Sequence, residues 1–521
     1  MKQKTFFQKK NFLPLYLIII LLLLNPLSGC IQLNPQADEN NPTSLTISYL
    51  DSSSIKPFSL GIKENILEGL LGFDHTFQVQ PLLSTSWTNP NDTTWRFYLK
   101  ENVTFHNGEP FTATDVYYSL MVYYQSVGVY VKNFSALDNH TIEIQTYEPI
   151  PNFLQILARY LYIYPYEYIT NETTYPVGTG PYKYKEYVES DYISLSRYDN
   201  YWGDLPIITN VTFIIESDPQ KIKQGLLNKT IDIANYNVDN SIKDIEDDPN
   251  IQIITFPPIA NYFIGFDMRE NNSYGYSDGQ NPTANLLVRK AIYHAINITP
   301  LIEGPFQGYA TPATQLVSPH IYGYNPDIVR LEYSPETSRQ LLTQAGYPDG
   351  FSITLDSITK GFEYNLENTQ LIQQMLQDVG INVTINHLST EEYREKVTQN
   401  KNTSLWLVGW NAVSFDGEIF YRNFLMNESD KYQGYYNSGH YNNTQVNSLG
   451  TLASTEMDSE KRQRYLKEGF RIALQDDVML VPLLSQALFI LAQPTLDIPA
   501  RADLGLFIKA VSYTHLTLPT N

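Results

Sequence analysis

Residue spacings typical of covalent catalysis find little support in this sequence. Ser53 and Lys56 match a Ser-x-x-Lys spacing, in which the lysine would help to activate a serine nucleophile. Pro57 follows directly, where that motif requires a continuing helix, and a proline removes a helical hydrogen bond. We therefore do not interpret this pair as a nucleophile with its base, and hydrolase chemistry is kept only as an alternative.

Metal and phosphate chemistry also lack their usual ligand patterns. The eight histidines are scattered, with no His-x-x-x-His or Glu-x-x-His pair that would bind zinc. The sequence GTGP at 178–181 has too few glycines, and no following Lys-Ser/Thr, to cradle a phosphate, so it predicts a turn. An enzymatic function is not favoured, and no metal or other cofactor is expected.

The only cysteine, Cys30, carries the clearest chemical signal. A basic start, an apolar stretch at 12–24 and a short small-residue segment precede it, which is the order of a secretory signal. The apolar stretch is shorter than the about 20 residues of a membrane-spanning helix. The tetrad LSGC at 27–30 resembles the lipobox of secreted lipoproteins, in which the cysteine sulfur receives a lipid and becomes the new N-terminus. A thiolate is well suited to forming that thioether.

Residues 1–29 are thus predicted to form a signal peptide, and the polar, proline-bearing residues 30–44 a flexible tether. We expect an extracytoplasmic protein held at the outer face of the cytoplasmic membrane by a lipid on Cys30. The alternative is a free cysteine in an uncleaved anchor. Because no second cysteine is present, there can be no internal disulfide, and packing alone must stabilise the fold.

Length and charge restrict the class of protein further. A mature part of roughly 490 residues exceeds the about 250–300 residues of a single core, so two or more lobes are expected. The hydrophobic fraction of 42% is enough for each lobe to bury a core. The net charge of −20 argues against nucleic acid as a partner, because phosphate binding needs clustered Lys and Arg.

Helix and strand signals alternate along the chain. Thr112, with Asp115 three positions later, predicts a capping-box helix start in FTATDVYYSLMVYY. Asp218 followed by Pro219 predicts a second helix start, before the alternating pattern TIDIANY. A third helix, SPETSRQLLTQAG, runs from Ser334 to Gly346 (334–346).

The stretch 366–385 predicts how these elements connect. A helix in NTQLIQQMLQDVG ends at Gly380, and the strand-like INVTIN follows it directly. This connection builds largely parallel sheets with helices on their faces. The fold class is therefore mixed α/β, with a ligand expected at strand ends or in a cleft between lobes.

A series of segments resembles the family 5 extracellular solute-binding proteins of ABC importers, which include receptors for peptides, nickel and some oligosaccharides. The most specific is WRFYLKENVTFHNGEPFTATDVYYSL (95–120), in which a Trp-x-Phe strand leads to Phe-His-x-Gly and then Thr-Ala-x-Asp-Val. Further matching segments follow in the family's order: PVGTGPYKY (176–184), RYDNYWGDLPIITNVTF (197–213), LLNKTIDIA (226–234), LLVRKAIYHAIN (286–297), YSPETSRQLLTQAGYPDG (333–350), LVGWNAVSFDGEIFY (407–421) and KRQRYLKEGFRIALQDDVMLVPL (461–483). The resemblance covers nearly the whole mature chain.

The resemblance implies a two-lobed, periplasmic-binding-protein-like fold of class II, a hinged clamp with an extended first lobe. We expect the chain to cross between the lobes near 257–264 and 482–490. The implied boundaries are 45–260 for the first lobe, 261–485 for the second and 486–510 for the return to the first.

It also implies a receptor rather than an enzyme. Such a receptor captures a peptide or peptide-like solute between its lobes, closes over it, and delivers it to an ABC permease driven by separate ATPase subunits. A monomer is expected. Two alternatives stay open: a receptor for an oligosaccharide or other non-peptide solute, and a secreted hydrolase.

One candidate site departs from the peptide-binding members. In those proteins an aspartate three residues after the Trp of a Gly-Trp block pairs with the peptide α-amino group, and the same count from Trp410 reaches Val413. Asp416 matches a later position, and is interpreted either as a turn or helix-cap carboxylate or as a residue brought into the cleft. Because a buried ammonium group without a carboxylate is costly, the departure puts dipeptide binding in doubt.

Trp410 is the leading candidate for solute binding, because its flat face can stack on a peptide side chain, a sugar ring or a cation. Core packing is the alternative. Trp406 alternates with it along the strand-like SLWLVGW and is more simply interpreted as packing. Asn261 and Tyr262 lie at the expected crossover, where the family often supplies main-chain contacts.

The chain's last residues form a separate expectation. Residues 511–521 (VSYTHLTLPTN) resemble a spurious translation found at broken ends of assembled sequences, and an ordinary short polar tail is the alternative. We expect residues 511–521 to pack poorly and to carry no function.

Overall fold

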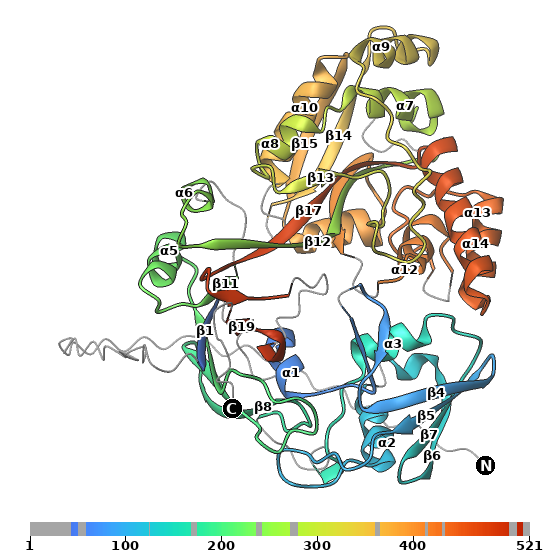
Figure 1. Ribbon diagram of the computed structural model, residues 1–521. Helices are drawn as coiled ribbons and strands as arrows, with labels where there is room; N and C mark the ends of the chain where they lie inside the picture. The colour runs from blue at the N-terminus through green and yellow to red at the C-terminus, as the bar shows by residue number, and fades with distance from the viewer. Residues whose placement is uncertain are drawn as a thin grey trace, which may run out of the picture.

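The computed structural model places most of the mature chain (Figure 1). It describes residues 43–50, 59–74, 76–123, 126–167, 175–235, 242–270, 280–359, 365–411, 415–429, 433–499 and 508–513. The predicted signal peptide, the lipid-attachment residue Cys30, the Ser53–Lys56 pair and Val413 lie outside these ranges.

One large mixed sheet runs through the described part of the molecule. Its strands follow the order β15-β14-β16-β12-β17-β11-β1-β10-β9-β8, with β13 also paired to β17. Their bounds are β15 Ile381–Leu388, β14 Phe351–Ile358, β16 Leu405–Asn411, β12 Gln252–Phe266, β17 Leu480–Ala492, β11 Ile233–Asn235, β1 Ser44–Tyr49, β10 Asn210–Ile215, β9 Tyr192–Arg197, β8 Tyr182–Val188 and β13 Ala310–Pro312.

The long antiparallel pair β12 and β17 divides this sheet into two parts. The first half of β12, residues 252–256, pairs with residues 488–492 of β17, whose end also pairs with β11. The second half of β12, residues 260–266, pairs with both β16 and residues 480–486 of β17. We call the part with β1 and β8–β11 lobe I, and the part with β14–β16 lobe II. The two segments predicted as crossovers lie in β12 and β17.

Lobe I contains a second, four-stranded antiparallel sheet, which lies at the lower right in Figure 1. Its order is β4 (Ser84–Asn91), β5 (Thr94–Leu99), β7 (Thr141–Thr146) and β6 (Val131–Asp138). A short hairpin, β2 (Leu71–Phe73) with β3 (Val79–Pro81), connects this sheet to the rest of the lobe. The main helices of lobe I are α1 (Leu60–Ile66), α2 (Ala113–Val122), α3 (Phe153–Tyr160), α5 (Pro219–Leu227) and α6 (Lys243–Glu246).

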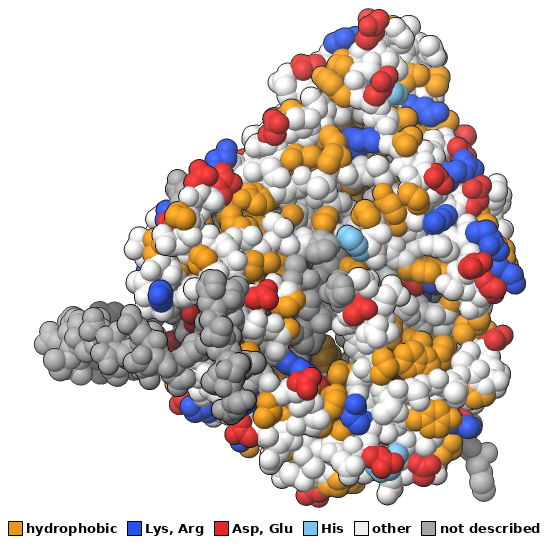
Figure 2. All heavy atoms as spheres, viewed as in Figure 1, with side chains coloured by type: hydrophobic (Ala, Val, Ile, Leu, Met, Phe, Trp, Pro, Cys, Tyr) orange, Lys and Arg blue, Asp and Glu red, His pale blue; other side chains and the backbone are white. Residues whose placement is uncertain are grey.

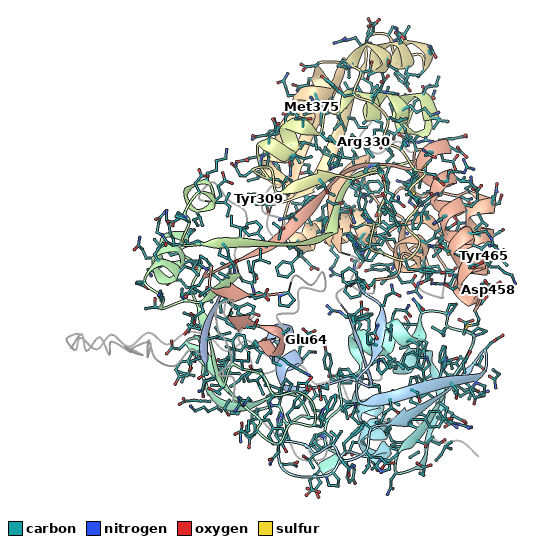
Figure 3. The ribbon with its side chains drawn as sticks, viewed as in Figure 1. Glu64, Tyr309, Arg330, Met375, Asp458 and Tyr465 are labelled. Carbon is teal, nitrogen blue, oxygen red and sulfur yellow. The ribbon has the colours of Figure 1, made fainter. Side chains whose placement is uncertain are left out.

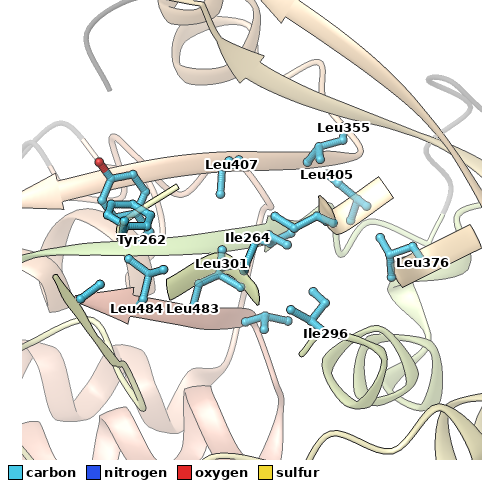
Figure 4. Packing of buried hydrophobic residues seen from close by; sticks show 14 of the residues in the cluster. Tyr262, Ile264, Ile296, Leu301, Leu355, Leu376, Leu405, Leu407, Leu483 and Leu484 are labelled. Carbon is cyan, nitrogen blue, oxygen red and sulfur yellow. The ribbon is translucent and has the colours of Figure 1, made fainter. Parts of the chain in front are cut away.

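Lobe II packs its helices on both faces of the large sheet. One core contains side chains of β12, β16 and β17, among them Tyr262, Ile264, Leu407 and Leu484 (Figure 4). The opposite core contains Phe263 and the helices near the C-terminal part of the chain. The helices of this lobe are α7 (Leu286–Ala295), α8 (Thr299–Glu303), α9 (Pro335–Gln344), α10 (Asn365–Gln377), α11 (Thr390–Tyr393), α12 (Glu418–Phe420), α13 (Thr444–Thr455) and α14 (Ser459–Arg471).

The predicted helix starts are confirmed. Asp115 Oδ2 accepts a hydrogen bond from the Thr112 N–H at 2.8 Å at the start of α2, and Asp218 Oδ1 accepts from Gln220 N at 2.9 Å at the start of α5. The Ser334 hydroxyl accepts from Thr337 N at 3.2 Å and caps α9.

The predicted connection at 366–385 is confirmed as well. Helix α10 is followed by β15, which pairs in parallel with β14. Gly380 between them has a φ of +98°, a backbone conformation that side chains disfavour.

The C-terminal residues differ in part from the prediction of poor packing. Val511 is buried in a lobe I core with Leu496 and Ile508, because it is apolar and faces that core. Ser512–Tyr513 form the short strand β19, which pairs with β18 (Leu496–Asp497). Residues 514–521 lie outside the described ranges.

The predicted tether also ends earlier than expected, because Ser44 already belongs to β1. In the part of the chain that the structure describes, no helix has both the length and the apolar character needed to cross a membrane.

Candidate solute site

A cavity of about 220 Å³ lies in lobe I. Its walls come from α1 and the residues after it, from the β2–β3 hairpin and from the C-terminal end of α3. Leu67, Leu71 and Leu82 give it apolar walls, to which a few charged and phenolic side chains are added. Mostly apolar walls with few polar groups are typical of ligand sites. Glu64, one of the lining residues, lies on the side of lobe I that faces lobe II (Figure 3).

Glu68 is a buried carboxylate at this cavity, with 6% of its surface exposed. It accepts hydrogen bonds from Tyr201 Oη at 2.7 Å, Trp202 Nε1 at 2.8 Å and Thr179 Oγ1 at 2.8 Å. Burial raises the pKa of Glu68, and these three donors and Lys509 oppose that rise. Because three donors already engage its two oxygens, Glu68 is mainly a fixed part of the cavity wall.

The GTGP turn at 178–181 holds Thr179 against Glu68. A Cβ atom on Gly178 would lie 2.1 Å from the Ile66 carbonyl oxygen, and one on Gly180 would lie 2.7 Å from the same atom. Only glycine permits so close an approach of two backbones. Gly178 and Gly180 therefore allow this turn to pack against the end of α1.

A second polar group lines the cavity beside Glu68. Glu64 Oε1 accepts a hydrogen bond from Tyr162 Oη at 2.9 Å, and Arg159 Nη1 lies 3.7 Å from the same Glu64 oxygen. The Lys63 ammonium lies 4.4 Å from the centre of the Tyr162 ring. Burial lowers the pKa of Lys63, and the charge of Glu64 opposes this effect.

Aromatic contacts join this part of lobe I to lobe II. Phe73, which lines the cavity, meets the edge of Phe415 at 5.0 Å between ring centres. Phe77, at the tip of the same hairpin, stacks on Phe415 at 4.1 Å and is counted among the buried side chains of the lobe II core. Figure 1 shows this blue hairpin rising beside α3 toward α12. Phe415 of lobe II is thereby brought next to Phe73, a lining residue of the cavity.

Trp410 lies in the same lobe II cluster and is partly buried. Its ring contacts Tyr436 at 4.4 Å, Phe424 at 5.1 Å and Phe420 at 6.2 Å between centres. Its Nε1 is buried without a hydrogen-bond partner among the described residues. The Trp410 ring is thus packed against three other aromatic rings, and its Nε1–H donor has no acceptor among the described residues.

The other candidates on the central strands divide between the two faces of the sheet. Asn261 lies opposite Trp410 in the β12–β16 register, and its side chain bonds to Leu316 O at 3.0 Å and to Ser485 Oγ at 2.5 Å. Tyr262 points into the other core and donates to Gln486. Trp406 is 5% exposed, and its ring occupies the space where Gly265 would carry a side chain. The structure brings Asn261 and Trp410 together and separates Tyr262 from them.

Asp416 is fully buried and forms a bidentate ion pair with Arg462. The two oxygen–nitrogen distances are 2.7 and 2.9 Å, and Asp416 Oδ1 also accepts from Glu418 N at 2.9 Å at the start of α12. Burial lowers the pKa of Arg462, but the charge and hydrogen bonds of Asp416 outweigh burial and raise it. These contacts agree with the interpretation of Asp416 as a turn and helix-cap carboxylate.

The described residues offer no obvious metal-binding cluster. Within the described ranges, no cluster of three His, Cys, Asp or Glu side chains could hold a metal ion. The sequence GYSDG at 275–279 has the Gly-x-Ser-x-Gly spacing and lies outside those ranges.

These features define a two-lobed binding protein with a site next to the contact between its lobes. The chain belongs to the bacterial extracellular solute-binding proteins, family 5, whose middle-region model matches residues 78–432. Members of this family are receptors of ABC transporters and not enzymes.

Individual proteins are similar over most of the chain. The glutathione-binding protein GsiB of Escherichia coli strain K12 is 27% identical over 450 residues, which are 82% of this chain and 85% of that protein. The fold matches HbpA2 from Haemophilus parasuis with a TM-score of 0.79 at 19% identity, over 90% of this chain and 99% of that one. It matches DppA from Helicobacter pylori in complex with the peptide STSA with a TM-score of 0.70 at 23% identity, over 90% and 98%.

Sequence reasoning did not find Glu64, Glu68, Arg159 and Tyr162. The partners of Glu64 and Glu68 lie 98 to 134 positions away in the sequence, so no local spacing indicates the cluster. The local sequence signal near this cluster was the predicted turn at 178–181, whose glycines allow close packing against Ile66.

The buried pair of Asp416 and Arg462 generates a stability prediction. Asp416→Ala leaves a buried guanidinium without its carboxylate and should lower the free energy of unfolding by roughly 3–5 kcal/mol. The double variant Asp416→Leu/Arg462→Met should recover much of that loss, because it removes both charges. Urea unfolding followed by circular dichroism measures both effects.

The exposed pair of Glu391 and Arg394 supplies the control. Glu391→Ala should change stability by less than about 1 kcal/mol. A stable Asp416→Ala variant that loses only solute binding would contradict the structural role of Asp416.

The aromatic contact between the lobes generates a second prediction. Phe77→Ala removes its stacking on Phe415 and should shift the balance between closed and open forms toward open by about 0.5–1.5 kcal/mol, the value of such a ring pair. Spin labels on cysteines introduced at the exposed positions Leu137 and Leu452, in a Cys30→Ser background, report the distance between the lobes.

Tyr147→Ala, which removes an exposed aromatic ring from lobe I, is the matched control and should leave the distance distribution unchanged. If Phe77→Ala also leaves that distribution unchanged, the contact does not favour the closed form.

Proposed function

We propose that this receptor captures a peptide or peptide-like solute between its lobes and delivers it to an ABC permease with its ATPase subunits. The observation that supports this most strongly is the lobe I cavity, because its lining residue Phe73 contacts Phe415 of lobe II. A solute in the cavity would reach both lobes at once. Two similar proteins, a glutathione-binding protein and a binding protein in complex with a peptide, favour the same ligand class.

The mechanism follows from the connection between the lobes. A solute that contacts both lobes interacts more strongly with the closed form than with the open form, and this difference shifts the equilibrium toward closed. The closed receptor, acting as a monomer, would then dock on the permease. No nucleotide site is required in this chain, because the ATPase subunits are separate.

Trp410 would form the lobe II side of the site, while Asn261, whose side chain is buried and engaged by Leu316 and Ser485, would offer only main-chain contacts. The aromatic side chains behind Trp410 hold its ring in place, and its Nε1 can donate to a solute acceptor. Asp416 is already engaged by Arg462, and Val413 offers no charge. Recognition of a solute ammonium group from lobe II therefore lacks the carboxylate used by peptide-binding members.

A lipid on Cys30 would hold the receptor at the outer face of the cytoplasmic membrane. Two acyl chains make such an anchor stable, whereas one would be marginal. The anchor keeps the receptor beside its permease, which explains why a chain of this length would keep one cysteine after an apolar leader.

The alternatives make different predictions for the same cavity. An oligosaccharide receptor would use the rings near Trp410 as stacking platforms, and a secreted hydrolase would turn over peptides or glycans. The charged pair of Glu64 and Arg159 favours a charged, peptide-like solute over a neutral sugar.

The function is tested first by identifying the solute that co-purifies with the native protein. Native mass spectrometry followed by denaturing extraction should release a short peptide or a related amino-acid conjugate. An oligosaccharide in the extract, or turnover of peptide or glycan libraries by the pure protein, would replace the proposal with one of the alternatives.

A second test uses Trp410. Trp410→Ala should weaken binding of that solute by roughly 1–3 kcal/mol, the range for losing an aromatic platform or its packing. Isothermal titration calorimetry measures the loss, with Trp87→Ala in β4 as the control tryptophan distant from β16. Unchanged affinity in a folded Trp410→Ala variant would move the site away from this residue.

The anchor is tested by Cys30→Ser. The variant should appear in the medium or remain unprocessed, because no thioether can form without the sulfur. Membrane fractionation and mass spectrometry of the N-terminal peptide detect both outcomes. Equal membrane partitioning of both proteins, with no lipid on either, would exclude the lipoprotein form.

A further inference from the structure

Arg159 differs from Arg289, Arg330 and Arg462, three other poorly exposed arginines of the described chain. Its side chain is 14% exposed, yet it donates no hydrogen bond within the described residues, and its nearest carboxylate oxygen, on Glu64, is 3.7 Å away. That distance exceeds the about 2.7–3.2 Å of a hydrogen bond from nitrogen. By contrast, Arg289, Arg330 and Arg462 each donate to backbone or carboxylate oxygens.

A poorly exposed guanidinium group such as that of Arg159 needs a hydrogen-bond acceptor. It carries five N–H donors in a flat fork, and poorly exposed donors in folded proteins nearly always find a partner. Arg159 lines the cavity, so an acceptor that enters the cavity can reach it. Glu64 does not meet this need, because its Oε1 accepts from Tyr162 at 2.9 Å while Arg159 stays at ion-pair distance.

The local charge also favours an anion. Among the described residues that line this end of the cavity, Glu64 is the carboxylate and Arg159 the cation, and Lys63 lies outside the lining, over the Tyr162 ring. At the other end Lys509 lies beside Glu68, over the rings of Tyr201 and Trp202, so these two charges offset each other. The remaining charge of about +1 suits a group with a single negative charge, since a doubly charged phosphate would face Glu64 with too few cations.

We propose that Arg159 binds a carboxylate of the solute in the lobe I cavity. This inference rests on the proposed function and specifies it: the solute is a small, peptide-like molecule with a free carboxylate, which lobe I recognises through a forked pair of hydrogen bonds. Arginine matches a carboxylate in this bidentate geometry better than lysine does. The solute is therefore oriented by its carboxylate in lobe I, and the aromatic side of lobe II receives its other end.

The test compares two peptide pools and four proteins. One pool contains tripeptides built from Ala, Leu, Phe and Ser, so that the C-terminal carboxylate is the only one, and the other contains the same tripeptides as C-terminal amides. Wild type, Arg159→Gln, Arg159→Lys and Arg96→Gln are measured by native mass spectrometry and, for the peptides retained best, by calorimetry. Arg96 is the matched control, because it pairs with Glu143 on the four-stranded sheet, away from the cavity.

Wild type and Arg96→Gln should retain the acids and not the amides. Arg159→Gln should weaken binding of the acids by roughly tenfold to a hundredfold, the effect of losing hydrogen bonds to a charged group. Arg159→Lys should recover part of this loss, because it keeps the charge without the fork. Equal retention of acids and amides by wild type, or unchanged affinity in a folded Arg159→Gln variant, overturns the assignment.

The design also separates this inference from the proposed function. If wild type retains neither pool, the chemical identity of the solute extracted from the purified protein decides which of the two proposals fails. A non-peptide solute that has a carboxylate and binds Arg159→Gln more weakly supports Arg159 and removes the peptide proposal. A solute without a carboxylate, or the absence of any bound solute, overturns the role of Arg159.

Discussion

The pairing of β12 with β17 is the constraint on which the rest of the structure depends. These two antiparallel strands are shared by both parts of the large sheet. The strands β14–β16 lie beyond β12, whereas β1 and β8–β11 lie beyond β17, with which β13 also pairs. Their ladder is interrupted between Phe256 and Ala260, where Pro257 and Pro258 have no N–H to donate. A second register shift lies within lobe II, between Tyr262 and Phe263, but the interruption between Phe256 and Ala260 separates the lobes, so the ladder can bend there without loss of either core.

The contact between the lobes includes a small aromatic part. Its described aromatic part is the packing of Phe73 and Phe77 on Phe415, and a single ring pair contributes only about 0.5–1.5 kcal/mol. In the proposed mechanism, a weak aromatic contact would keep the closed and open forms close in free energy, so a solute would need only a modest difference in affinity to shift their populations. A strong contact would close the receptor without solute and remove the signal that the permease reads.

Local rules predicted the local parts of this molecule. The caps at Thr112, Asp218 and Ser334, and the direct connection from α10 to β15, depend on residues within a few positions of each other, and each was predicted from the sequence. Asp416 was also interpreted by a local rule as a cap, but its main partner, Arg462, is 46 positions away and no spacing indicates it. The lobe I cavity depends on contacts across about a hundred positions or more, such as Glu64 with Tyr162, so only the fold could bring its residues together.

The overall charge and the site charge have opposite signs, and both fit the same function. The chain carries a net charge of −20, which at long range disfavours an anionic solute. Salt screens that repulsion beyond about 8 Å under physiological conditions. Inside the cavity solvent screens less, so the nearest charges, Arg159 with Lys63 and Glu64, decide which solute is held. Because the attraction acts only at short range, an anion must fit the cavity before it is bound, which makes recognition depend on shape as well as on charge.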